Sequence, residues 1–228
     1  MILAKSEIME RLRDGEIVIS PFDERQLGTN SYDVRLGENF AFILPESYDV
    51  IHLLPNSIHY RKQRVYDPLD EELVKSMWTI KTVERGEGFV LQPYQTVLGH
   101  TLEFIGGIGS PLQPISSNFH TRSGSKRNLF DCNGGAGYGD VGYVGRWTVE
   151  ITNHHSVPLL LRPGMRIGQI EFKTLAGTTH QYGEERFSGK YGKGPDEWTP
   201  EDMLPKSYRD WDVDKVKDGS IIVSTVKA

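Results

Sequence analysis

The stretch Arg146-Trp-Thr-Val-Glu-Ile151 alternates strictly between polar and apolar residues. Successive side chains of a β-strand point to opposite faces of its sheet, so this pattern predicts a strand with one apolar face and one polar face. The apolar face carries Trp147, Val149 and Ile151, and the polar face carries Arg146, Thr148 and Glu150. Strands disfavour glutamate, so Glu150 is expected either to face solvent or to serve a function.

Other short apolar segments lie on both sides of this strand. Each is rich in β-branched or large apolar residues and is bounded by turn residues: 17–19, 31–37, 88–92, 96–104, 157–161 and 166–172. Within 31–37, alternation places Asp33 and Arg35 on one face and Val34 and Leu36 on the other. Many short strands separated by glycine-rich turns indicate a mainly β fold of the sandwich, jelly-roll or barrel type.

The remaining segments are less regular. A short helix is expected at the N-terminus, from an N-cap at Ser6 to a C-terminal glycine at Gly15. Residues 44–86 are polar and contain three prolines, and we expect them to form a loop or hairpin excursion from the core. From about residue 176 onward the chain has little apolar periodicity and is expected to form an arm or tail.

The amino-acid composition of the chain argues against some classes of binding partner. The chain has 228 residues, with 26 Lys and Arg against 31 Asp and Glu, and a formal net charge of −5. This balance argues against an extended surface for nucleic acid or an anionic membrane, but it allows a local phosphate site. No membrane span and no signal peptide are expected. Cys132 is the only cysteine, which excludes a disulfide within the chain and a multi-cysteine zinc site, and favours a reducing, cytoplasmic compartment.

Two segments are candidates for a nucleotide site. Thr121-Arg-Ser-Gly-Ser-Lys-Arg127 combines three cations with hydroxyl groups and a glycine, which are the groups that bind a polyphosphate. The alternative is a solvated basic loop. Residues 134–145 contain six glycines in twelve positions, which indicates either close approach of a ligand to the backbone or a glycine-rich hairpin.

Taken together and in order, these segments resemble the deoxycytidine triphosphate deaminases, a branch of the dUTPase-like superfamily. The resemblance begins in the predicted N-terminal helix and strand, is close in Pro21–Leu27 and Asn30–Gly37, and continues in the Arg122–Arg127 loop. It then covers Ala136–Asn153, Leu161–Phe172 and Ser188–Tyr191. Four ordered motifs with their internal spacing kept are a more specific signal than any one of them alone.

The resemblance implies a distorted β-barrel or jelly roll of the dUTPase-like type, with a short N-terminal helix, assembled as a homotrimer with active sites between subunits. Residues 1–195 would form the deaminase-like β domain. The 44–86 excursion lies within that domain, 176–195 would be a flexible lid, and 196–228 would be a C-terminal tail.

The resemblance also implies catalytic roles. Glu150 corresponds to the family's catalytic glutamate, which activates water for attack on C4 of cytosine and passes the proton to the leaving ammonia. Ser123 and Arg127 correspond to residues that position this water. Such general acid–base work requires a carboxylate near the ring and no zinc.

The resemblance implies that a larger set of residues binds the nucleotide. Its members are Arg122, Ser123, Gly124, Arg127, Ala136, Tyr138, Asp140, Tyr143, Gln169 and Lys190. In the family, Ala136 corresponds to a small residue beside the base, and Asp140 to the acid that holds the 3′-hydroxyl. Tyr143 corresponds to an aromatic residue under the sugar, and Lys190 to a triphosphate-binding lysine of the lid.

The implied reaction is hydrolysis of dCTP to dUTP and ammonia, feeding dUMP and dTTP synthesis. Some family members continue to dUMP and pyrophosphate, and the sequence leaves the product open. Mg²⁺ is expected on the triphosphate, zinc is not, and dTTP is a candidate inhibitor. Two alternatives remain: a dUTPase, for which Glu150 has no use, and a non-catalytic nucleotide-sensing trimer.

Overall fold

The computed structural model describes residues 1–43, 68–132, 137–177, 180–184, 191, 193–206, 214, 217 and 218. The chain divides into two compact units. The first comprises Met1–Phe42 and Ile80–Met203, and the second comprises Ile43–Thr79 and Leu204–Ala228. None of the helices in the described ranges is long and apolar enough to cross a membrane.

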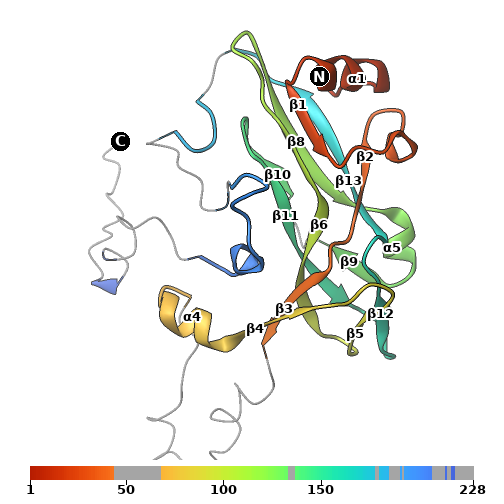
Figure 1. The fold of residues 1–228 in the computed structure, drawn as a ribbon, viewed down its shortest axis with the longest axis vertical. Coiled ribbons are helices and arrows are strands. Elements are labelled where there is room, and N and C mark those ends of the chain that lie inside the picture. Colours follow the sequence, from red (N-terminus) through yellow and green to blue (C-terminus); the bar gives the residue numbers. More distant parts are fainter. Residues whose placement is uncertain are drawn as a thin grey trace, which may run out of the picture. The chain divides into compact units, whose positions relative to one another are not determined.

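A six-stranded sheet contains the strand that holds Arg146–Ile151 (Figure 1). Its strands are β1 (Ile17–Ser20), β3 (Asn39–Ile43), β4 (Trp78–Thr82), β6 (Thr96–Gly107), β9 (Phe130–Cys132) and β11 (Val144–Asn153). The order is β4-β3-β6-β11-β9, and β1 pairs with β6 outside this path. Strand β11 therefore lies between β6 and β9, with an antiparallel neighbour on each side.

A second sheet has five strands. They are β2 (Tyr32–Arg35), β7 (Gly109–Ser110), β8 (Gln113–Thr121), β10 (Tyr138–Gly139) and β13 (Arg166–Thr174). The order is β10-β8-β13-β2, with β7 paired to β8. Strands β5 (Phe89–Leu91) and β12 (Leu159–Leu161) form a separate two-stranded sheet. The prediction of a mainly β fold is confirmed.

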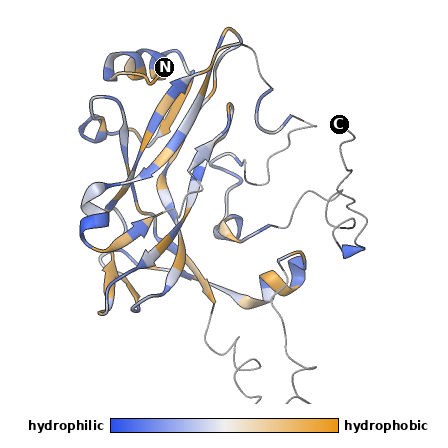
Figure 2. Ribbon diagram, turned by 180° about the vertical axis from the view of Figure 1, so that it is seen from behind, coloured by the Kyte–Doolittle hydropathy of each residue, from blue (hydrophilic) through white to orange (hydrophobic). Residues whose placement is uncertain are grey.

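One hydrophobic core joins the two larger sheets. Fully buried side chains from both of them belong to the same cluster, including Tyr32 and Phe172 from one sheet and Ile105 and Ile151 from the other. Figure 2 shows hydrophobic and hydrophilic residues along the same strands, as expected for sheets that bury one face. The predicted faces of 31–37 are confirmed, because Val34 and Leu36 are buried while Asp33 and Arg35 are partly exposed.

Helix α1 (Lys5–Arg13) begins earlier than predicted. Its N-cap is Ala4 and not Ser6. The Glu7 carboxylate accepts a hydrogen bond from the Ala4 N–H at 3.1 Å, which gives a partner to one of the N–H groups left unpaired at the start of the helix. The predicted end is confirmed. Gly15 follows the C-cap with a φ of +75°, a conformation that glycine adopts without a side-chain clash.

Two further helices lie where loops were predicted. Residues 71–77 form helix α4 (Glu71–Met77), in which the Asp70 carboxylate caps the N-terminus by accepting from the Leu73 N–H at 3.0 Å. The loop-or-hairpin prediction for 44–86 is therefore wrong at this helix, and residues 44–67 lie outside the described part. The Arg122–Arg127 loop contains the short helix α5 (Ser123–Arg127). Two 3-10 helices, η1 (Glu24–Gln26) and η4 (Pro200–Met203), complete the described structure.

Candidate active site

The polar face of β11 places Glu150 beside the central strand of its sheet. Burial alternates along the whole of β11, so Trp147, Val149 and Ile151 are buried while Glu150 is half-buried on the opposite face. Leu98 of β6 lies directly across from Glu150. In the ranges that the structure describes, the Glu150 carboxylate makes no hydrogen bond or ion pair, so it is available to a ligand or a water molecule.

Asp131 connects this face to the basic segment. It lies on β9 opposite Thr152 of β11, and its carboxylate accepts a hydrogen bond from Thr121 Oγ1 at 2.8 Å and forms an ion pair with Lys126. Desolvation raises the pKa of Asp131, but the hydrogen bonds from Lys126 and Thr121 outweigh it and lower the pKa below its usual value. Asp131 is not among the residues that the sequence predicts for the site. Its position five residues after Lys126 was visible, but the turn that brings the two together was not.

Helix α5 exposes three of the predicted site residues. Ser123, Gly124 and Arg127 are exposed, whereas Ser125 is buried. A Cβ atom added at Gly124 would have no heavy atom within 4 Å, so packing does not require glycine there. Within the described residues, the side chains of Ser123 and Arg127 have no partner, which leaves a hydroxyl and a guanidinium free to bind an anion.

Arg122 directly follows β8, and Gln169 lies on β13, the strand paired with β8. Arg122 forms an ion pair with Asp33 of β2, and Arg166 of β13 approaches the same Asp33 oxygen at 3.4 Å. Gln169 lies between Asp33 and His120 in the strand register. Two guanidinium groups thus share one carboxylate, and the local excess of positive charge is suited to an anionic ligand. Alternation predicted the polar face that holds Asp33 but not its partners.

The glycine-rich segment is described only from residue 137. Tyr138 is 77% exposed on β10, and Asp140 is exposed in the following turn. Tyr143 packs edge-on against Trp147 at 5.3 Å and Tyr182 at 5.1 Å between ring centroids, and burial raises its pKa. Of the other predicted residues, Ala136 and Lys190 lie outside the described part of the chain.

One glycine of this segment is needed for packing. A Cβ atom at Gly139 would lie 2.6 Å from the ring of Trp147 and 2.5 Å from the hydroxyl of Ser117. The close approach of β10 to the core therefore requires glycine at this position.

The described residues hold no group of three or more His, Cys, Asp and Glu side chains that could bind a metal ion. Two carboxylates that contact the segment 121–127, those of Asp33 and Asp131, are already paired with cations. A Mg²⁺ ion held mainly by phosphate oxygens fits such a donor set, because it needs few protein ligands. Burial raises the pKa of the Cys132 thiol to about 12, so it remains protonated at neutral pH.

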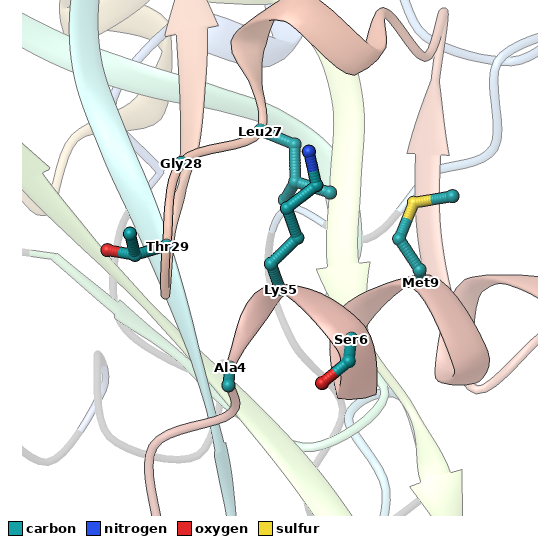
Figure 3. A pocket seen from close by; sticks show the side chains of 7 residues that line it. All are labelled: Ala4, Lys5, Ser6, Met9, Leu27, Gly28 and Thr29. Carbon is teal, nitrogen blue, oxygen red and sulfur yellow. The ribbon is translucent and has the colours of Figure 1, made fainter.

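A depression of about 760 Å³ lies away from these residues (Figure 3). It is bounded by the first turn and a half of α1 and by the turn before β2: Ala4, Lys5, Ser6, Met9, Leu27, Gly28 and Thr29. None of the predicted site residues lines it, so the chemistry inferred above does not use it.

His100 is a buried polar residue on the same face as Glu150. It lies on β6 opposite Thr148, with its ring Nδ1 2.8 Å from the Thr101 carbonyl oxygen, and its Nε2 accepts from the Asn39 N–H at 3.3 Å. These partners fix the neutral tautomer with the proton on Nδ1. Burial is the main cause that lowers the pKa of His100 to about 4, and the nearby Arg146 lowers it further.

Acidification is expected to destabilise the protein through His100. Between about pH 6.5 and pH 4 the unfolded chain binds a proton at this imidazole and the native protein does not, so the free energy of unfolding falls as the pH falls. The His100 contribution to this fall is about 3 kcal/mol, from the separation of the two pKa values. Denaturant titrations from pH 7 to pH 4 measure it.

The control for that titration is His100→Gln, in which the amide oxygen can still accept the hydrogen bond. The variant is expected to be less stable at pH 7, but its stability should fall less steeply over the same range. Equal slopes for the two proteins would contradict the assignment, because every other titrating group is common to both.

Comparisons with known proteins agree on one family. A family model described as dCTP deaminase-like matches residues 2–175. A protein of Methanobrevibacter smithii called "dCTP deaminase, dUMP-forming" is 33% identical over 194 residues, covering 84% of this chain and 90% of that protein. A "dCTP deaminase" of Natronomonas pharaonis is 34% identical over 200 residues, covering 86% and 92%.

A solved structure supports the fold. The crystal structure of 2′-deoxycytidine 5′-triphosphate deaminase from Agrobacterium tumefaciens matches with a TM-score of 0.50 and 20% identity. The match covers 75% of this chain and 47% of that chain. Together with the matched family model, which spans most of the chain, and relatives above 30% identity, these findings show that the chain belongs to the dCTP deaminase-like family.

Proposed function

We propose that this protein removes the exocyclic amino group of dCTP by hydrolysis of the C4–N bond, with Glu150 as the general acid–base. The observation that carries the proposal is a half-buried carboxylate in the middle of a strand, free of any cation or hydrogen-bond partner among the described residues. A carboxylate that only stabilised the fold would be paired or fully solvated. The names of the relatives support the same substrate class.

The proposed step balances with one water. Glu150 takes a proton from the water as its oxygen attacks C4 of the cytosine ring, and it passes this proton to the ring nitrogen N3. Glu150 then takes the remaining proton from the new C4 hydroxyl and gives it to the amino group, the C4–N bond breaks, and ammonia leaves, with dUTP as the other product of this step. Ser123 and Arg127 would position the water, since both are exposed and unpaired among the described residues.

The phosphates are proposed to lie against the cationic groups around α5. Arg122, with Arg166 sharing its carboxylate, supplies fixed positive charge, and the remaining nucleotide contacts would follow the family pattern. Mg²⁺ would enter with the triphosphate. No zinc is required in this scheme, and the single buried cysteine of the chain offers no thiolate to hold it.

We also propose a homotrimer and the domain boundaries that the resemblance implies. The site residues are divided between two sheets of one chain, Glu150 on the six-stranded sheet and Gln169 on the five-stranded sheet. An assembly in which neighbouring chains complete each site would account for a polar strand face that is half-open in one chain. We propose residues 1–195 as the domain, residues 176–195 within it as the lid, and residues 196–228 as the tail.

The expected product is dUMP. Five of the relatives bear the words "dUMP-forming". Incubation with dCTP and Mg²⁺ should therefore release one ammonia and one pyrophosphate per dCTP. Chromatography of the nucleotides, with enzymatic assays of ammonia and pyrophosphate, measures the ratio.

Any other combination of products would contradict part of the proposal. Ammonia with dUTP and no pyrophosphate would mean deamination alone. Pyrophosphate from dUTP with no ammonia from dCTP would indicate a dUTPase, and bound but unchanged dCTP would indicate a nucleotide-sensing protein. The last two results would refute the role of Glu150.

A further inference from the structure

Helix α5 carries Ser123 and Arg127, the residues proposed to position the water, and it has only five residues. A helix this short does not form by itself, because its few hydrogen bonds do not offset the cost of the first turn. Its place therefore depends on contacts with other elements. Among the side chains of α5, Lys126 is the only one with a polar partner outside the helix in the described residues, and that partner is the carboxylate of Asp131 on β9.

The turn between α5 and β9 contains a strained residue. Leu129 has a φ of +53°, a left-handed conformation in which the Cβ atom of any residue except glycine crowds the backbone carbonyl oxygen. Its side chain is 48% exposed, so burial does little to hold it. Its carbonyl oxygen accepts from the His154 N–H at 2.9 Å, which fixes Leu129 itself but not the helix before it. Such a conformation persists only where the surrounding contacts hold the backbone in place.

Asp131 bridges this strained turn. Lys126 lies three residues before Leu129 and Asp131 lies two residues after it, so their ion pair joins the two ends of the turn. The same carboxylate accepts from Thr121 Oγ1 at 2.8 Å, at the end of β8. The Asp131 side chain is 19% exposed, so solvent and salt screen these contacts less than they would at the surface. Asp131 therefore ties β8, α5 and β9 together around the strained residue.

The two ends of α5 are anchored by different carboxylates. Arg122, the N-cap, has its own ion pair with Asp33 of β2. Arg127 is the last residue of the helix, and its side chain has no partner among the described residues. It directly follows Lys126, so the pair with Asp131 is the side-chain contact that fixes this end. Loss of the pair should displace Arg127 and leave Arg122 in place.

We infer that Asp131 is a positioning residue, which holds the C-terminal end of α5 and thereby sets the place of the Arg127 guanidinium. Asp131 lies opposite Thr152, two residues beyond Glu150 on β11. Directly opposite residues of an antiparallel pair share one face of the sheet, so this anchor lies on the face that carries Glu150. The inference rests on the proposed roles of Glu150 and Arg127 in deamination.

The catalytic test is Asp131→Asn, which keeps the shape of the side chain and removes the charge that holds Lys126. For ammonia release from dCTP, kcat is expected to fall about tenfold, because small displacements of positioning groups are costly. KM should change little, because Arg122 keeps its anchor. Adding Leu129→Gly should restore most of kcat, since glycine adopts the left-handed conformation without crowding. This second substitution restores no charge, so the rescue indicates that Asp131 acts by holding the turn.

A double-mutant cycle shows whether Asp131 acts through Arg127. Arg127→Met is expected to lower kcat by itself, and Asp131→Asn added to it should lower kcat no further. Effects that multiply, a wild-type kcat in Asp131→Asn, or no rescue by Leu129→Gly would overturn the inference. The matched control is Glu24→Gln, an acid-to-amide change at an exposed ion pair with Lys5, which should leave kcat and KM unchanged.

Hydrogen exchange tests the anchor without any activity measurement. The Asn128 N–H donates to the carbonyl oxygens of Gly124 at 3.1 Å and Ser125 at 3.0 Å, so its exchange reports opening of this end of α5. It should exchange faster in Asp131→Asn and more slowly again when Leu129→Gly is added. Exchange equal to that of the wild type would refute the anchor. A wild-type protein that releases no ammonia, with exchange altered as expected, would refute the proposed function and the catalytic half of this inference but not the anchor.

Discussion

Replacing Glu150 with glutamine is expected to reduce ammonia release from dCTP by about 10²–10⁴-fold, the usual contribution of a positioned general acid–base. Glutamine has the same shape but cannot take a proton from water at neutral pH. The half-buried position on β11 should accept it, because no cation or hydrogen-bond donor among the described residues depends on the carboxylate. Turnover should therefore fall while dCTP still binds.

Two measurements check this result. Ammonia release gives turnover, and calorimetric titration with dCTP gives binding. The control is Glu10→Gln, the same substitution at an exposed position of α1, which should leave turnover and dCTP binding unchanged. Full deamination by Glu150→Gln would end the assignment of this residue, and loss of binding together with turnover would mean that Glu150 holds the substrate instead of activating water.

The largest expected effect on stability concerns Arg35. Its Nε donates to Glu103 Oε1 at 2.6 Å and its backbone N–H donates to Glu103 Oε2 at 2.9 Å, and the Glu103 side chain is fully buried. Arg35→Met would leave this carboxylate without its cation inside the protein. Breaking a buried ion pair in this way costs about 3–5 kcal/mol, which would unfold a marginally stable domain. Urea denaturation of the purified variant measures the loss.

Two variants show whether the loss comes from the unpaired charge. Arg35→Met combined with Glu103→Leu removes both charges and should regain most of the stability, because an apolar pair can replace a buried ion pair at little cost. Arg25→Met breaks the ion pair with Asp23 at a site where Arg25 is 88% exposed, and stability should hardly change. A double variant as unstable as Arg35→Met would indicate that the arginine matters through packing.

Local patterns predicted the alternating strand β11 but missed strand β8. Along the whole of β11, partly exposed side chains alternate with buried ones, so the period of two could be recognised in the sequence. Strand β8 was not predicted, because Pro114–Ser117 are buried consecutively and include the small polar residues Ser116 and Ser117. A strand covered on both faces has no period of two, and hydroxyl groups in its core hide its apolar character.

Helices inside polar segments were missed for a different reason. The seven residues of α4 and the five of α5 are too short for a helical period to stand out. Their positions depend on caps and on side-chain partners, such as Asp70 before α4 and Asp131 beside Lys126 of α5. Such partners lie outside the helix itself, before it for Asp70 and on β9 for Asp131, and a local sequence pattern does not show that they come together with it.

The sequence by itself determined the mainly β class, the polar row that carries Glu150, and a family resemblance that the comparisons confirm. The tertiary structure decided which side chains surround that row. It brought Asp33 to Arg122 across 89 residues and Trp198 onto Arg146, and it left Glu150 unpaired among the described residues. The physical reason is that the face of a strand follows from a local period, whereas its neighbours depend on which distant strands pair beside it.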